Sequence, residues 1–187
     1  QKESLFQSPS DYSVFNIRRI SLSADGEYLN LRLNKQRGDF MNDYLYKIPL
    51  DKSKKAESWE LDKKFAFDVF LAYRNDKVIV RKMTENGKNA ASVIQICNFE
   101  DRKVLTEIPY KDRNTVCVYA DFYGNDDKAL LLNRISRNGN IEDSYNELIA
   151  PAENRCFNLK IFPYDIIYLK NENAFTGIDM SSGHLLH

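Results

Sequence analysis

The sequence contains few of the residues on which enzyme and metal sites usually depend. Of its 187 residues only two are histidine and three are cysteine, and the two histidines are His184 and His187. A Ser–His–Asp triad needs a well-placed histidine base, and a tetrahedral zinc site needs clustered Cys and His. The phosphate-binding patterns GxxxxGK[ST] and GxGxxG and the nucleophile pattern GxSxG are also absent. The sequence therefore predicts no catalytic residues, no metal site and no cofactor.

A surplus of one charge and a long hydrophobic run are missing as well. Lys and Arg number 27 and Asp and Glu also number 27, whereas a nucleic-acid binder usually presents a basic surplus. No apolar run approaches the roughly 20 residues that a membrane span needs. We therefore expect a soluble protein that does not bind nucleic acid and does not span a membrane. The compartment stays open between the cytoplasm and a processed periplasmic or secreted chain.

The three cysteines do not form a disulfide framework. Cys97, Cys117 and Cys156 are odd in number, form no CxxC pair and lie in apolar stretches. They are expected to be buried free thiols.

Short apolar runs separated by turn signals recur along the chain. Three hairpin signals carry Asp25, Asp76 and Asp126, at spacings of 51 and 50 residues. Each is followed by a third and a fourth apolar run, so each unit reads as four antiparallel strands. Within the runs apolar residues alternate with polar ones, as in Leu29, Leu31 and Leu33. The pattern predicts an all-β chain of four-stranded repeats of about 48 residues.

The repeat resembles β-propeller blades. The stretch from Ile20 to Leu29, which contains Ser-Ala-Asp-Gly, is similar to the first hairpin of TolB-like propellers and of the N-terminal propellers of prolyl-oligopeptidase-type proteins, with Ala24 in place of their usual proline. The stretch 42–51 resembles the third strand of those blades, and 165–186 is similar to quinoprotein-type blades. The resemblance implies a propeller-like architecture.

The expected organisation is an N-terminal extension, 1–14, followed by a propeller-like domain, 15–187. The blades are expected at about 15–61, 65–109, 115–162 and 164–187. Three to four blades are fewer than most propellers have, so we expect a part of a larger propeller, completed by the same protein or by another chain. A closed four-bladed propeller and a non-propeller barrel or sandwich remain alternatives.

Two surface features are candidates for binding a protein partner. One is the loop after the second strand, which places Phe40 and Met41 beside Arg37. The other is a basic cluster, Lys52–Lys55 with Lys63 and Lys64, around Trp59. An exposed Trp beside lysines is typical of an interface anchor, although lysines also protect exposed sheet edges.

These observations predict a non-enzymatic module that serves as a protein-interaction platform. A first alternative is the substrate-gating propeller of a larger peptidase-like enzyme, as the resemblance implies. A second is a small-ligand or glycan binder whose pocket is lined by tyrosines, namely Tyr44, Tyr46, Tyr73 and Tyr123.

Overall fold

The computed structural model describes residues 14–23, 25–37, 40–61, 68–74, 76–84, 91–110, 114–123, 128–137, 140–150, 155–159, 167–169, 174–178 and 185–186. Its secondary structure consists of β1 (Val14–Leu22), β2 (Tyr28–Arg37), β3 (Phe40–Pro49), β4 (Glu57–Glu60), β5 (Val69–Arg74), β6 (Lys77–Thr84), β7 (Ala91–Asn98), β8 (Val104–Pro109), β9 (Thr115–Tyr123), β10 (Lys128–Arg137), β11 (Asn140–Ala150), β12 (Arg155–Leu159), β13 (Ile167–Leu169), β14 (Ala174–Ile178) and β15 (Leu185–Leu186). These ranges contain no helix, and hence none that could cross a membrane.

The strands form open antiparallel sheets in which each strand pairs with its neighbours in sequence. Three sheets have four strands, in the orders β1-β2-β3-β4, β5-β6-β7-β8 and β9-β10-β11-β12. A three-stranded sheet follows, in the order β13-β14-β15. The prediction of an all-β chain with antiparallel four-stranded sheets is confirmed.

The turn signals lie where the first two sheets begin their hairpins. Between β1 and β2, Gly26 has a φ of 75°, a conformation that glycine adopts without steric cost. The hydroxyl of Ser23 accepts a bond from Tyr28 N at 2.9 Å, and the Asp25 carboxylate accepts one from Glu27 N at 3.0 Å. Between β5 and β6, Asp76 takes the left-handed conformation with a φ of 60°, which Asp tolerates better than most residues.

The first two sheets have the same register when the numbering is shifted by 49 residues. Tyr28 pairs with Pro49 across β2 and β3, and Lys77 pairs with Asn98 across β6 and β7. The same correspondence appears in a backbone bond that closes each sheet near its first turn. Leu50 N donates to Glu27 O at 2.9 Å, and Phe99 N donates to Asp76 O at 2.7 Å.

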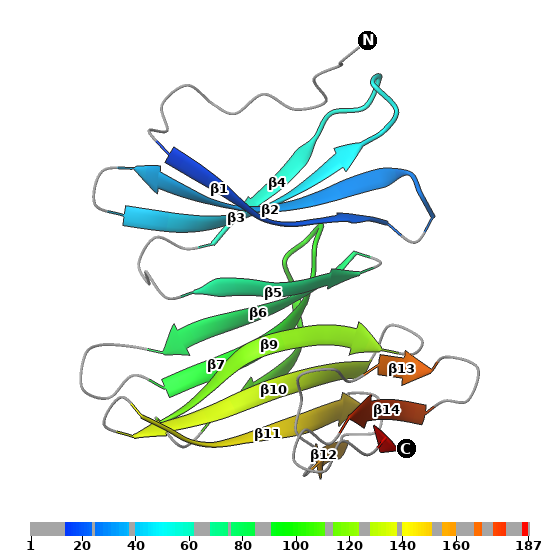
Figure 1. Cartoon of the computed structure of the whole chain (residues 1–187). Coiled ribbons are helices and arrows are strands. Elements are labelled where there is room, and N and C mark those ends of the chain that lie inside the picture. The colour runs from blue at the N-terminus through cyan, green and yellow to red at the C-terminus, as the bar shows by residue number, and fades with distance from the viewer. Residues whose placement is uncertain are drawn as a thin grey trace.

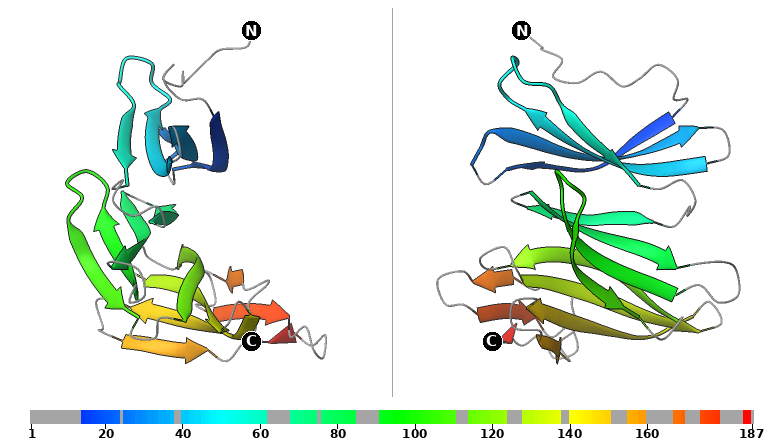
Figure 2. Two further views of the ribbon diagram at one scale, coloured as in Figure 1. Left: turned by 90° about the vertical axis from the view of Figure 1, so that its left-hand side faces the viewer. Right: turned by 180° about the vertical axis from the view of Figure 1, so that it is seen from behind.

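The four-stranded sheets follow one another as layers (Figure 1). Viewed from the side, β1 and β5 lie on one side of the first two layers and their fourth strands lie on the other (Figure 2). Because the middle sheet is covered on both faces, its strands are apolar on both. Val78 and Val80 face the first sheet, and Ile79, Ile94 and Ile96 face the third, all of them 3% exposed or less.

Two hydrophobic clusters join the layers. The cluster between the first and second sheets consists of Leu45, Trp59, Leu61, Phe70, Val78, Val80, Cys97 and Phe99. The cluster between the second and third sheets consists of Leu71, Ala72, Ile79, Ile94, Ile96, Tyr110, Cys117, Ala120, Phe122, Ala129 and Leu131. Cys97 and Cys117 are buried thiols that are not in a disulfide, as predicted. The side chain of Cys156 lies outside the described part.

Candidate functional site

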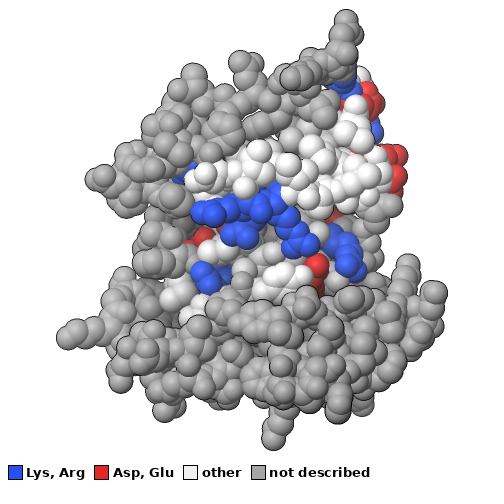
Figure 3. Space-filling view, in the orientation of Figure 1, with Lys and Arg blue, Asp and Glu red and all other residues white. Residues whose placement is uncertain are grey.

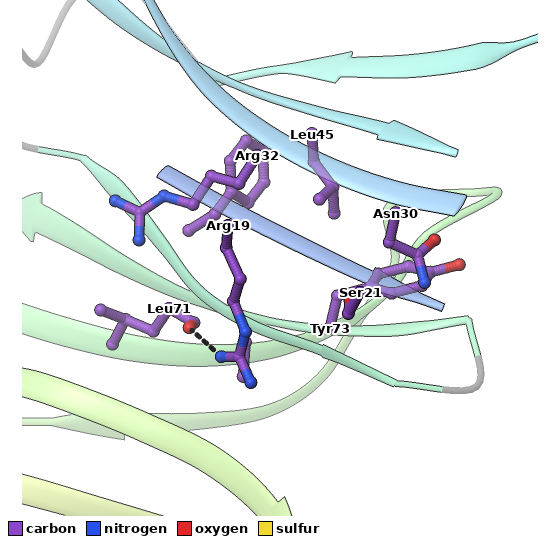
Figure 4. Close-up of a pocket in the computed structure, with 9 residues that line it drawn as sticks. Arg19, Ser21, Asn30, Arg32, Leu45, Leu71 and Tyr73 are labelled. Carbon is purple, nitrogen blue, oxygen red and sulfur yellow. Dashed lines mark hydrogen bonds between the residues drawn. The ribbon is translucent and has the colours of Figure 1, made fainter. Parts of the chain in front are cut away.

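Side chains of the three four-stranded sheets come together at a seam, defined here by Arg19, Arg32, Asp43, Leu71 and Asp121. Arg19 comes from β1, and its guanidinium donates to the carbonyl of Leu71 on β5 at 3.5 Å (Figure 4). The same guanidinium contacts the carboxylate of Asp121 on β9 at 3.3 Å. One exposed side chain on the first sheet therefore reaches both of the other four-stranded sheets.

β1 contains a β-bulge at two consecutive arginines, Arg18 and Arg19. The register of β1 against β2 shifts between Ile17 and Arg19, which leaves Arg18 as the extra residue. Arg18 lies on the surface, and its Nε donates to the amide oxygen of Asn34 at 2.5 Å. The first strands of the other two four-stranded sheets also carry register irregularities, at Leu71 in β5 and at Val118 in β9.

The acidic centre of the seam is Asp43, which is almost completely buried. Its carboxylate accepts bonds from Arg32 Nε at 3.1 Å, from Asn34 Nδ2 at 3.1 Å and from the backbone N of Phe70 on β5 at 2.9 Å. Burial raises the pKa of Asp43, and the charge of Arg32 and the bond from Phe70 N only partly oppose it. Asp43 thus orients Arg32 and joins the first sheet to the second.

Further polar contacts join the sheets away from the seam. On β6, Arg81 donates to the carbonyl of Cys117 on β9 at 3.0 Å, and burial lowers its pKa. On β3, Lys47 contacts Asp76 in the β5–β6 turn at 2.5 Å. The hydroxyl of Tyr73 donates to the same Asp76 carboxylate at 3.1 Å. These contacts fix how the layers sit on one another.

A small hollow opens beside the seam, lined by Arg19, Ser21, Asn30, Arg32, Leu45, Phe70, Leu71, Ala72 and Tyr73 (Figure 4). Its volume is about 20 Å³, room for roughly one water molecule. Small-molecule sites usually enclose about 300–1,000 Å³. Asn30 is 4% exposed, and within the described structure its Oδ1 accepts no hydrogen bond. This hollow is too small to be a pocket for a small ligand.

The tyrosines considered for a ligand pocket are used mainly in packing. Tyr44, Tyr46 and Tyr123 are each 8% exposed or less. Tyr44 and Tyr46 stack at a centroid distance of 6.3 Å, with the ammonium of Lys35 within 4.8 Å of both rings. Tyr73 lines the hollow, but its hydroxyl is bonded to Asp76.

The surface next to the seam is apolar and exposed. Ile17, Ile20 and Leu22 on β1, called the β1 row below, are 53–59% exposed. Tyr119 on β9 is 48% exposed, and its hydroxyl donates to Asp121 at 3.3 Å. Figure 3 shows this side of the molecule, on which Lys and Arg form a band across the middle. Exposed apolar residues beside arginines are typical of protein interfaces.

Trp59, one of the residues predicted to bind a partner, is not part of this surface. The prediction of an exposed Trp59 is wrong, because its side chain is 7% exposed and packs edge-on against Phe70 and Phe99, at centroid distances of 5.5 and 6.4 Å. Arg37, Phe40 and Met41 lie at the end of the β2–β3 hairpin, where Arg37 pairs with Phe40. Their side chains, and the whole of Lys63, lie outside what the structure describes.

The sequence contains a signal for the seam that strict alternation of apolar and polar residues does not reveal. Three apolar residues of β1 are Ile17, Ile20 and Leu22. The first two are three positions apart, whereas regular alternation in a strand gives a spacing of two. Such a step within a strand indicates a bulge, and here it falls on the two arginines.

No family model, no curated protein and no solved structure matches this chain.

Proposed function

We propose that this chain is a propeller-like β-repeat module that binds another protein and carries out no chemistry of its own. Its sheets would be arranged as blades, with the first strand of each innermost, and would belong to a larger ring. The bound protein would contact the side of the molecule formed by the first strands.

One observation carries the proposal: the seam, where a residue of β1 contacts both β5 and β9. In a propeller the first strands of successive blades line a common axis, so contacts between first strands are expected there. The exposed β1 row and Tyr119 lie beside this seam. We therefore take the surface around the seam as the best candidate for a protein interface.

The proposal can be tested by site-specific photo-cross-linking in the cells that produce the full-length protein. A photoreactive amino acid at Ile20 is expected to cross-link to a discrete second polypeptide. The matched control is Leu105 on β8, which is apolar and similarly exposed at 47% but lies on a fourth strand. If Ile20 gives no product that Leu105 does not also give, the proposed interface is wrong.

A further inference from the structure

The edge of β1 combines an unpaired strand side with two different faces. β1 is the first strand in the order of its sheet, and among the described residues only β2 pairs with it. Such an edge presents backbone N–H and C=O groups that another strand can pair with. Asn16 through Ile20 are all exposed, so the side chains along this part of the edge are accessible.

One face of this edge continues a buried apolar surface. Ile17 and Ile20 pair with Leu33 and Leu31 on β2 and therefore share their face. Leu31 and Leu33 are 6% and 1% exposed, whereas the β1 row is more than half exposed. A strand added beside β1 would extend this face and shield part of the β1 row from water, which is favourable.

The other face of the edge is basic. Arg19 pairs across the sheet with Arg32, and Arg18 precedes it at the bulge. The contacts of Arg19 with Leu71 O and Asp121 are long, at 3.5 and 3.3 Å, and Arg18 bonds to the neutral amide of Asn34. Each of these guanidinium groups therefore retains N–H groups that can donate hydrogen bonds to a carboxylate.

The charges decide which strand fits. A second copy of β1, paired antiparallel about the bulge, would bring Arg18 and Arg19 close to the same arginines of its partner, and like charges across strands are destabilising. An extended segment with apolar residues on one face and Asp or Glu on the other satisfies both faces of the edge. We infer that β1 binds such an alternating acidic and apolar segment of another protein by adding it to the sheet as a strand.

This inference rests on the proposed function and names the chemistry of its partner. The probes are synthetic peptides as long as β1, nine residues, labelled for fluorescence anisotropy and added to the full-length protein. One alternates Val with Glu, and its control alternates Val with Lys. The acidic peptide is expected to bind at least about tenfold more tightly. Equal binding of the two peptides, or no binding of the acidic one, would overturn the inference.

Two further acidic peptides test whether binding adds a strand. They are N-methylated at the odd or at the even positions, and in an edge strand only alternate N–H groups point at the neighbouring strand. One methylated peptide should lose binding and the other should keep it. An equal effect of the two would show charge attraction without strand pairing and would reject the proposed mode.

Variants of the protein locate the binding. Arg18→Glu is expected to weaken the acidic peptide by about tenfold or more and to strengthen the lysine peptide. The matched control is Lys103→Glu, which makes the same charge change at an exposed residue outside β1. Far-UV circular dichroism verifies folding, and Ile20→Ser provides a second variant that leaves the charge unchanged. If neither β1 variant alters binding, the site is not on β1.

Two outcomes separate this inference from the proposed function. If Ile20 gives a cross-link but the acidic peptide does not bind, the proposed interface is retained and the addition of an acidic strand to β1 is rejected. A dimer in analytical ultracentrifugation that Ile20→Ser abolishes would reject the acidic segment in favour of a second copy.

Discussion

Asp76 serves both the β5–β6 turn and the contact between the first two sheets. Its backbone has a φ of 60°, and its carboxylate bonds to Lys47, whose side chain is 7% exposed. Burial works against the charge of Lys47, but the bond and the charge of Asp76 outweigh it and raise the pKa of this lysine. The backbone conformation and the ion pair can therefore be separated by substitution.

Replacing Asp76 with Asn is expected to lower the free energy of unfolding by about 1–2 kcal/mol, because the ion pair is lost while the turn is kept. Asp76→Ala should cost about 1 kcal/mol more, since alanine tolerates the left-handed conformation poorly. Urea denaturation measures both. Equal stabilities of the two variants would contradict the role given to the backbone.

Asp43 predicts an unusual dependence of stability on pH. Its pKa in the folded chain is raised above the ordinary value of 3.8, so the folded state binds the proton more tightly than the unfolded state does. The contribution of this carboxyl group to stability therefore decreases as the pH rises from about 3.8 through its folded pKa. Compared with Asp43→Asn, which does not titrate, the natural protein should gain stability on acidification across this range.

The measurement is the free energy of unfolding of both proteins from neutral to acidic pH. Asp25 and Asp51, whose pKa values are lowered by hydrogen bonds, have the opposite dependence but are present in both proteins and cancel in the difference. A difference that stays constant, or moves the other way on acidification, would show that burial does not dominate at Asp43.

At the scale of the elements, the middle sheet contributes buried residues to the clusters on both of its faces. Ile94 on β7 is fully buried in the cluster shared with the third sheet. Ile94→Ala is expected to cost about 2–5 kcal/mol, through the lost transfer energy and the cavity left behind. Ile20→Ala, at an exposed position of β1, should change stability by no more than about 0.5 kcal/mol. Chemical denaturation of the two variants makes the comparison, and similar losses would show that the layers are not packed as described.

The sequence was sufficient to predict the described strands of the four-stranded sheets and the first two turns, but not the seam. Alternation such as Leu29, Leu31 and Leu33 reflects a local property of a strand, and Asp25-Gly26 reflects a local property of a turn. Which sheets contact each other depends on residues far apart in sequence, such as Arg19 and Asp121, and one sequence contains no information on such pairs. The error at Trp59 has the same origin, since its burial depends on Phe70 and Phe99 of the neighbouring sheet.

For the whole molecule, the thiols report separately on the two interfaces between sheets. Cys97 lies in the cluster between the first and second sheets, and Cys117 lies in the cluster between the second and third. Burial raises the pKa of Cys97 to about 11, so at about pH 8 only roughly one thousandth of it is thiolate, the reactive form.

In a Cys156→Ser variant, neither remaining thiol should react with a disulfide reagent in the native protein, and two should react in urea. Variants that retain a single cysteine extend the test. If the stacked sheets open together, Cys97 and Cys117 should become reactive with the same free energy of opening. Rapid labelling of either one in the native state would show that its interface is not closed.

The meander order of the sheets has a consequence for how the chain folds. Every described ladder joins strands that are neighbours in sequence, so no strand must wait for a distant part of the chain before it can pair. Sequence-local contacts shorten the search for the native state, and an emerging chain folds from its N-terminal side first. The first sheet can therefore complete its ladder during synthesis. Its apolar face then provides the surface against which the second sheet packs as it forms.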